Sequence, residues 1–436
     1  MGGQKFKISG KEYPSMGRKE EFQFVCEKYS DVPKNFILKT DLLRRGVTLS
    51  REALIRLQDP FFEHAPWTLF QWHHEDQTES YGIPGCFHLK DATYVGLIIS
   101  PPEEDPYYID LLDDKFWIFS DGEPLEEIFW SPRPNFYDKT TGSGLAMQAV
   151  AFLKSRDVFF VIPYRHCHFW NEGLQCKFCD MDYNTKHQMK MGRWFKTRAN
   201  PQDIYEAAKE ALKAKGKWRH ICLTGGSHPG DNFNRELDIY LESIKAVKDA
   251  CKEAHVPDRL PIAVFLSPLD EDQNNKLYEA GVSAIYNDME VWDEGRFKLI
   301  CPGKQKHIGW KKWIEKMNGA VEIFGEGNVS SIFVTGVEMS PPPYGFDDVD
   351  QAINSTLDGW KYLLDRGVVP TSANWSIVPG SYFYKIGAKQ PPLEFYVKLD
   401  RARHHLMKNS QVGLNFFFEC YMDEPWSASS DWRRLL

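Results

Sequence analysis

The sequence feature that most constrains the fold is a regular alternation of strand-like and helix-like segments from about residue 157 onward. Short apolar runs, each typical of a strand buried on both faces, alternate with longer helical patterns. The expected strands span residues 158–162, 220–226, 262–267, 283–290, 329–338 and 368–378. The expected helices span residues 201–216, 236–254, 274–281, 308–324, 349–365 and 393–409. This alternation predicts an α/β fold with a parallel sheet, either an open doubly wound sheet or an incomplete barrel.

The first 150 residues lack this regularity. Their aromatic patches are separated by proline and acidic turns and lie at residues 61–62, 67–72 and 116–119. This part of the chain is typical of an α+β domain, and its role cannot be inferred from the pattern. We therefore expect an α+β N-terminal domain over residues 1–150, a strand–helix domain over residues 151–410 and a C-terminal extension over residues 411–436.

Composition excludes several classes of protein. Hydrophobic residues make up 42% of the 436 residues, which is ample for a folded core and excludes disorder as the main state. The 53 basic and 61 acidic side chains give a net charge of −8, so a nucleic acid partner is not expected. No apolar run approaches the length of a membrane span, and the start lacks the apolar core of a secretory signal, so we expect a cytoplasmic protein.

In either architecture the reactive site belongs at the carboxyl ends of the parallel strands. Polar residues and glycines follow each of the six expected strands at that edge. They are Arg165 to Cys167, Thr224 to Ser227, Ser267 and Pro268, Asn287 and Glu290, Gly336 and Glu338, and Asn374 to Gly380. We therefore expect the chemistry of this protein at that edge of the sheet.

Three of the nine cysteines form a cluster, Cys167, Cys176 and Cys179, with the spacing C-x8-C-x2-C. The other six are scattered and are typical of buried, small apolar residues. Three thiolates on one loop suit zinc or an iron–sulfur cluster. A structural zinc site would need a fourth ligand, which His166, His168 or Cys222 could supply. A [4Fe–4S] cluster held by three cysteines would instead leave one iron open for a small molecule, as in a catalytic metal site.

The combination of motifs resembles the radical S-adenosylmethionine superfamily over about residues 157–410. A three-cysteine loop follows the first strand and carries an aromatic residue, Phe178, just before its last cysteine. The second strand ends in Thr224-Gly225-Gly226-Ser227, similar to the Gly-Gly-Glu motif of the family. Two features depart from the usual pattern: the first gap between cysteines is longer, and Ser227 stands where the family often has Glu.

The resemblance implies a partial (β/α)6 barrel like an incomplete TIM barrel, with a [4Fe–4S] cluster and S-adenosylmethionine as cofactors. It implies an oxygen-sensitive enzyme in which Cys167, Cys176 and Cys179 ligate the cluster. Reductive cleavage of S-adenosylmethionine would give a 5′-deoxyadenosyl radical that abstracts hydrogen from an organic substrate. An electron donor such as a flavodoxin or a ferredoxin would be the partner protein. The alternative is a zinc-stabilised binding or scaffold protein.

The resemblance also implies positions that contact S-adenosylmethionine. Phe178 would pack beside the adenine, although the sequence is equally consistent with an aromatic residue of the core at this position. Gly225, Gly226 and Ser227 would receive the methionine ammonium, or would form an ordinary strand-to-helix turn.

Further positions follow from the later strands. Glu290, or else Asn287, would contact the ribose hydroxyls. The sequence is equally consistent with a surface residue or a helix cap at this position. Lys304 could pair with the methionine carboxylate, but a solvated lysine is the preferred interpretation. The other positions are Val334 and Gly336 near the adenine, Glu338 facing substrate, Asn374 near cofactor or substrate, and His228 as a substrate-side acid or base.

Overall fold

The computed structural model describes residues 4–64, 83–190, 196–255, 260–410, 412 and 424–435. Its larger sheet has seven strands in the order β15-β14-β13-β12-β11-β10-β9. The strands are β9 (Ala151–Lys154), β10 (Val158–Tyr164), β11 (His220–Gly225), β12 (Ile262–Phe265), β13 (Ala284–Tyr286), β14 (Val329–Thr335) and β15 (Val368–Asn374). Strands β10 to β15 pair in parallel in the order of the sequence, so the expected partial (β/α)6 barrel is confirmed.

An additional strand, β9, was not foreseen. It pairs antiparallel with β10 at the start of the barrel, so β9 and β15 are the two edges of the sheet. Every residue of β10 is buried, because the barrel interior covers one face of this strand and helices cover the other.

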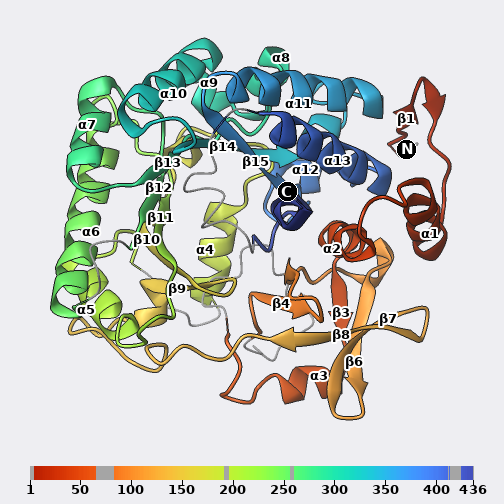
Figure 1. The fold of residues 1–436 in the computed structure, drawn as a ribbon, viewed down its shortest axis with the longest axis horizontal. Helices are drawn as coiled ribbons and strands as arrows, with labels where there is room; N and C mark the ends of the chain where they lie inside the picture. Colours follow the sequence, from red (N-terminus) through yellow and green to blue (C-terminus); the bar gives the residue numbers. More distant parts are fainter. Residues whose placement is uncertain are drawn as a thin grey trace.

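Figure 1 shows the barrel helices α5, α6, α7 and α10 in an arc around the outside of the strands. Helix α5 starts at a recognisable cap, where the Asn200 side chain accepts from the N–H of Gln202 and Pro201 lies in the first turn. The helices are α4 (Met181–Lys190), α5 (Pro201–Ala211), α6 (Asn234–Glu253), α7 (Glu271–Glu279), α8 (Glu294–Ile300), α9 (Pro302–His307), α10 (Trp310–Phe324), α11 (Val349–Leu364), α12 (Tyr382–Lys385) and α13 (Leu393–Asn409).

The expected elements differ from the structure mainly at the fourth strand. We expected a strand over residues 283–290, but β13 ends at Tyr286. The chain then leaves the regular ladder, and Glu290 adopts a left-handed backbone conformation with φ of 69°. Two short helices, α8 and α9, follow before α10. These helices place a further residue, Lys304, next to the end of β13.

The N-terminal part of the chain forms a second, six-stranded sheet in the order β3-β6-β7-β8-β4-β5, which confirms the α+β expectation. Its strands are β3 (Val47–Leu49), β4 (Cys86–Leu89), β5 (Tyr94–Gly96), β6 (Tyr107–Leu112), β7 (Lys115–Ser120) and β8 (Glu123–Trp130). The accompanying elements are β1 (Lys7–Ile8), β2 (Lys11–Glu12), α1 (Arg18–Lys28), α2 (Lys34–Arg45) and α3 (Arg51–Arg56).

The C-terminal segment joins the two parts of the molecule. The 3-10 helix η5 (Ala428–Leu435) packs with α2, α13 and β15, and the C-terminus lies near these elements in Figure 1. Lys39 of α2 and Asp431 of η5 form an ion pair at 2.6 Å, and both side chains are fully buried. The N-terminal sheet and the barrel are therefore tied together through the end of the chain.

Some expectations stay predictions. The boundaries at residues 150 and 410 are not tested by the element positions. Half of the expected extension, residues 411, 413–423 and 436, and the aromatic patch at 67–72 lie outside the described residues. No helix in the described ranges is both long enough and apolar enough to span a bilayer.

Candidate active site

The three clustered cysteines lie on one loop at the carboxyl end of the first parallel strand. β10 ends at Tyr164, and Cys167 directly precedes a short 3-10 helix, η3 (His168–Trp170). The N–H of Cys179 donates to the carbonyl of Cys176 at 3.0 Å, so these two cysteines share one tight turn. All three side chains are half-buried. The loop thus lies at the edge of the sheet where the strand alternation predicts the reactive site.

The three thiols influence one another's ionisation. Burial first, and then the neighbouring thiol of Cys176, raise the pKa of Cys167 to about 12. Burial also raises the pKa of Cys179 well above its usual range, with added repulsion from Asp180 and Cys176. Thiolates crowded in this way need a positive partner, which a metal centre supplies. The donor set therefore fits a group that is bound through thiolates.

The thiols do not converge on one point. Among the described residues, no three His, Cys, Asp or Glu side chains lie close enough together to hold a single metal ion. A [4Fe–4S] cube does not need such convergence, because each cysteine binds a different iron. Two candidates for a fourth zinc ligand are held elsewhere. Cys222 is fully buried within β11, and Nε2 of His168 lies 2.8 Å from the hydroxyl of Tyr164.

A fourth cysteine lies beside the loop, and sequence reasoning counted it among the scattered ones. The thiol of Cys301 makes a hydrogen-bond contact with Cys176, and this contact, followed by burial, raises the pKa of Cys176. Cys301 is fully buried where α8 meets α9. No sequence signal could have paired these residues, because they are far apart in the chain.

Gly225 to Ser227, at the end of β11, brace the cysteine loop. The N–H of Gly226 donates to the carbonyl of Tyr164 at 3.1 Å, and the N–H of His168 donates to the carbonyl of Ser227 at 2.9 Å. A Cβ atom on Gly226 would lie 2.2 Å from the carbonyl oxygen of His166. Only glycine lets the end of β11 approach the loop this closely.

A carboxylate that sequence reasoning missed stands behind Ser227. Glu236, in the first turn of α6, is 2% exposed. Its two oxygens accept from the N–H groups of His228 and Ser267, both at 2.7 Å. The hydroxyl of Ser267 in turn donates to that of Ser227 at 3.1 Å. Burial raises the pKa of Glu236 above its usual value, while these donors oppose the rise. The position of Glu236 within an ordinary helix pattern gave no signal of this role.

Lys304 is not solvated, so the preferred interpretation of this residue is wrong. Its side chain is 9% exposed, and Nζ lies 2.5 Å from the carboxylate of Glu290. Nζ also donates to the carbonyl of Asp288 at 2.6 Å. Burial lowers the pKa of Lys304, but Glu290 and the thiol of Cys176 raise it more, so the net direction is upward. The ammonium is therefore a buried positive charge close to the cysteine loop.

Asn287 and Phe178 are both positioned by the core. Asn287 is 1% exposed, and its amide nitrogen donates to the carbonyl of Leu266 at 3.1 Å. Its amide oxygen has no hydrogen-bond partner among the described residues. Phe178 is half-buried and packs against the hydrophobic core of the barrel. Their roles toward a cofactor stay predictions.

After the end of β14, the structure contradicts the expectation that Glu338 faces substrate. Glu338 does not face an open site: it accepts from the N–H of Gly336 at 2.7 Å and from the hydroxyl of Thr356 on α11 at 2.9 Å. Gly336 has φ of 105°, and a Cβ atom there would lie 2.3 Å from the Tyr396 hydroxyl, so it is glycine for packing and backbone reasons. Val334 is half-buried beside the core, and its N–H donates to the carbonyl of Glu290 at 3.0 Å.

Three histidines gather next to Cys167. The rings of His168 and His228 have centroids 3.8 Å apart, and His166 lies edge-on to His168. Burial lowers the pKa values of His168 and His228. This grouping brings the expected candidate His228 to the cysteine loop.

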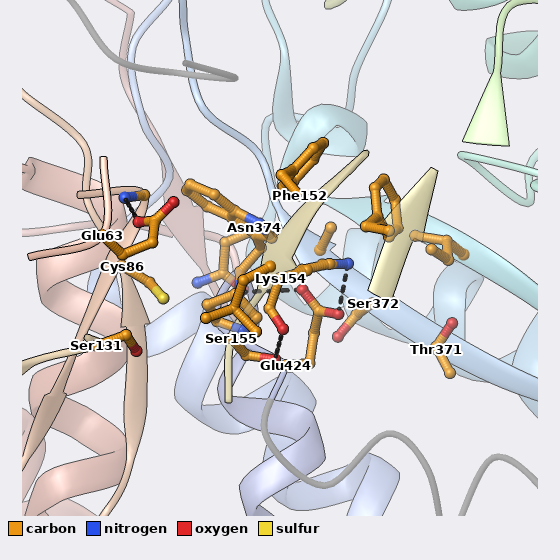
Figure 2. Close-up of a pocket in the computed structure, with 17 residues that line it drawn as sticks. Glu63, Cys86, Ser131, Phe152, Lys154, Ser155, Thr371, Ser372, Asn374 and Glu424 are labelled. Carbon is orange, nitrogen blue, oxygen red and sulfur yellow. Dashed lines mark hydrogen bonds and ion pairs between the residues drawn. The ribbon is translucent and has the colours of Figure 1, made fainter. Parts of the chain in front are cut away.

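Asn374, at the end of β15, lines a cavity of about 200 Å³ between the N-terminal sheet and the barrel. Figure 2 shows the residues around this cavity, including Asn374, Glu63 of the N-terminal part and the ion pair between Lys154 and Glu424. The structure therefore brings the expected site residue Asn374 together with groups from the N-terminal and C-terminal parts of the chain.

No protein-family model matches the chain. It is 23% identical over 286 residues to the bacteriochlorophyllide c C-7(1)-hydroxylase of Chlorobaculum limnaeum, an alignment that covers 62% of this chain and 68% of the hydroxylase. It is 25% identical over 146 residues to the 5-amino-6-(D-ribitylamino)uracil–L-tyrosine 4-hydroxyphenyl transferase of Archaeoglobus fulgidus, which covers 32% of this chain and 38% of the transferase.

Among solved structures, the chain is similar to a radical S-adenosylmethionine methyltransferase from Sphaerobacter thermophilus, with a TM-score of 0.39 and 12% identity over 94% of this chain and 97% of the other. Both sequence relatives are enzymes, as the motifs of this chain predict for it. The cysteine loop lies at the end of the first barrel strand, where the reactive site was expected. The cysteine loop at the end of the first strand and the partial (β/α)6 sheet of this chain resemble those of radical S-adenosylmethionine enzymes, which use a [4Fe–4S] cluster and S-adenosylmethionine.

Proposed function

We propose that this enzyme cleaves S-adenosylmethionine reductively and abstracts a hydrogen atom from an organic substrate. The observation that carries the proposal is the loop of Cys167, Cys176 and Cys179 at the carboxyl edge of an open parallel barrel, braced by Gly226. When bound, the cluster and S-adenosylmethionine supply an electron transfer and a 5′-deoxyadenosyl radical able to attack an unactivated C–H bond. The chain itself binds, orients and shields these groups.

In this proposal the three thiolates hold three irons and leave one iron open to the methionine part of S-adenosylmethionine. The close approach at Gly226 fixes the loop against β11, so the three thiols would hold a cluster at this edge of the sheet. Glu236 stabilises the same edge through its bonds to the backbone of His228 and Ser267. Its buried carboxylate would also favour the methionine ammonium beside Ser227.

Phe178, Asn287, Glu290, Val334 and Gly336 remain the proposed neighbours of S-adenosylmethionine, and Asn374 remains a proposed neighbour of either the cofactor or the substrate. The ion pair between Glu290 and Lys304, at 2.5 Å, limits how Glu290 can bind a ribose hydroxyl. One carboxylate oxygen already has a cation as partner, so a ribose hydroxyl would donate to the other oxygen. The electron donor of the proposal is a flavodoxin or a ferredoxin.

The two sequence relatives are named for a hydroxylation and for a hydroxyphenyl transfer, both of which change organic molecules. These names support an organic substrate for this chain as well. A zinc-stabilised scaffold is not favoured, because both relatives are enzymes.

The test is anaerobic reconstitution of the full chain with iron and sulfide, followed by dithionite and S-adenosylmethionine and an assay for 5′-deoxyadenosine. We expect a brown protein with about four irons per chain that forms 5′-deoxyadenosine. Cys176→Ala should lose the cluster and the product, whereas the control Cys26→Ala, on helix α1, should keep both. A colourless protein that holds one zinc per chain and forms no 5′-deoxyadenosine would refute the proposal.

A further inference from the structure

The cavity of about 200 Å³ lies between the N-terminal sheet and the open side of the barrel. Its walls come from three parts of the chain, as Figure 2 shows. The N-terminal part supplies Glu63, Gly85, Cys86 and Ser131, the barrel supplies residues 152–155, 160, 332 and 371–374, and the C-terminal part supplies Glu424, Pro425 and Trp426. A cavity at such a junction is a typical place for a small-molecule site.

The C-terminal wall is held against both sheets. The N–H of Gly96 in β5 donates to the carbonyl of Pro425 at 2.8 Å, and the N–H of Asn374 in β15 donates to the carbonyl of Trp426 at 2.9 Å. The Trp426 ring also packs on Gly96 so closely that a Cβ atom there would lie 2.3 Å from it. The cavity is therefore a feature built by tight packing on both of its sides.

Most of the lining is apolar. Phe152, Phe160 and Trp426 offer aromatic faces, and Leu153 and Ile332 add aliphatic surface. Such walls favour a flat ring system. Engineered apolar cavities of about 150 Å³ bind benzene, so the larger volume here suits a bicyclic ring or a part of a molecule of that size.

One polar group in this apolar lining lacks a partner. Asn374 is 8% exposed, and its amide nitrogen Nδ2 has no hydrogen-bond partner among the described residues. An unpaired buried donor costs about 1–3 kcal/mol, so a ligand that offers an acceptor here gains that energy back. The acceptor is best supplied by an oxygen atom of the ligand.

The charges around the cavity indicate that this oxygen is neutral. Lys154, the ammonium in the lining, already lies 2.9 Å from the carboxylate of Glu424. The second carboxyl, Glu63, accepts from the N–H of Gly85 and from the hydroxyl of Tyr137, both at 3.1 Å, and its burial raises its pKa to about 7. Among the described residues of the lining, no surplus positive charge would compensate a carboxylate on the ligand.

We propose that this cavity is the substrate site of the enzyme and that it takes a mainly apolar ring compound whose neutral carbonyl oxygen accepts a hydrogen bond from Nδ2 of Asn374. This inference rests on the proposed function and adds the class of substrate to it.

The test uses the full, cluster-reconstituted chain under argon and isothermal titration with two probes of the same size, 2-acetylnaphthalene and 2-ethylnaphthalene. Asn374→Leu should weaken binding of the ketone about tenfold relative to binding of the hydrocarbon, since one hydrogen bond to a buried donor is lost. The matched control Asn354→Leu, at an exposed position of α11, should leave both affinities unchanged.

A second variant reaches the same cavity from another side. Thr371→Leu adds apolar bulk to the barrel wall and leaves Asn374 in place, so it should weaken binding of both probes. A third probe, 2-naphthoate, should bind the wild type more weakly than the ketone. The proposal is overturned if the ratio of ketone to hydrocarbon affinity is the same in wild type and Asn374→Leu, if Thr371→Leu binds both probes as the wild type does, or if 2-naphthoate binds best.

The binding assay separates this inference from the proposed function. A preparation that forms 5′-deoxyadenosine but does not bind the ketone overturns the cavity assignment alone. A preparation that binds the ketone through Asn374 but forms no 5′-deoxyadenosine overturns the proposed reaction alone.

Discussion

At the scale of single residues, Gly226 is the position where a side chain would do most harm to the cysteine loop. Gly226→Ala would place a Cβ atom 2.2 Å from the backbone of His166, so the loop must shift away from β11. We expect the variant to lose most of its cluster, measured as iron per chain after reconstitution. The control Gly319→Ala, on helix α10 with open space at its Cβ, should bind iron normally and gain about 1 kcal/mol of stability. Normal iron content in Gly226→Ala would contradict this account of the loop.

Glu338 gives a pH-dependent prediction. Burial raises its pKa to about 7, above the value of about 4.3 in an unfolded chain. The folded state therefore favours the protonated carboxyl, and the stability that this provides is full below the unfolded pKa and is lost as the pH rises through the folded pKa. Glu338→Gln removes this dependence, so the stability of the variant relative to wild type should increase by about 3 kcal/mol between about pH 4 and pH 8. Urea unfolding at both pH values measures the difference, and a difference that does not change with pH would contradict it.

The roles of Glu338 and Lys304 show what a sequence cannot reveal about single residues. Both stand where a reactive carboxylate or a solvated ammonium is plausible, yet each has a partner from another element, Thr356 on α11 and Glu290 after β13. Such partners become visible only when the chain is folded. The three cysteines, by contrast, were predictable because their spacing lies within one loop.

At the scale of elements, helix α6 holds the ends of β11 and β12 through Glu236. Glu236→Ala removes the acceptor of the N–H groups of His228 and Ser267, and two such bonds to a carboxylate support an expected loss of about 3 kcal/mol. The cysteines are untouched, so iron content should persist while formation of 5′-deoxyadenosine slows.

The matched control is Glu242→Ala on the same helix, where the carboxylate forms an exposed ion pair with Arg198. That change should cost less than about 1 kcal/mol. Equal stabilities of the two variants in urea unfolding would show that Glu236 does not hold the strand ends.

The elements themselves were largely predictable. The helix expected over residues 393–409 matches α13, because its apolar spacing is regular and a proline precedes it. β9 and the helices α8 and α9 were missed because β9 is short and because Gly295, Pro302 and Gly303 are typical of loops.

At the scale of the whole molecule, the buried pair Lys39–Asp431 ties the N-terminal part to the C-terminal segment. Lys39→Met removes the lysine partner of Asp431 and leaves the ion pair between Asp431 and Arg434, at 3.3 Å, in place. We expect a loss of about 3 kcal/mol and faster proteolysis of the C-terminal segment. The double variant Lys39→Met with Asp431→Leu should recover most of the loss, whereas Lys34→Met, at an exposed position of the same helix, should change little. Proteolysis of Lys39→Met at the wild-type rate would contradict this tie.

The assembly of the two sheets could not be predicted from the sequence. The cavity beside Asn374 needs residues from the N-terminal sheet, the barrel and the C-terminal segment at once. Sequence periodicity describes one element at a time, so it identified Asn374 but not its neighbours.

The most direct test of the central claim is the electron paramagnetic resonance spectrum of the dithionite-reduced, reconstituted chain, recorded with and without S-adenosylmethionine. If Cys167, Cys176 and Cys179 leave one iron open, the reduced protein gives a [4Fe–4S] signal whose g values shift when S-adenosylmethionine binds that iron. A reduced cluster whose spectrum is the same with and without S-adenosylmethionine, or the absence of any cluster signal, would contradict the account.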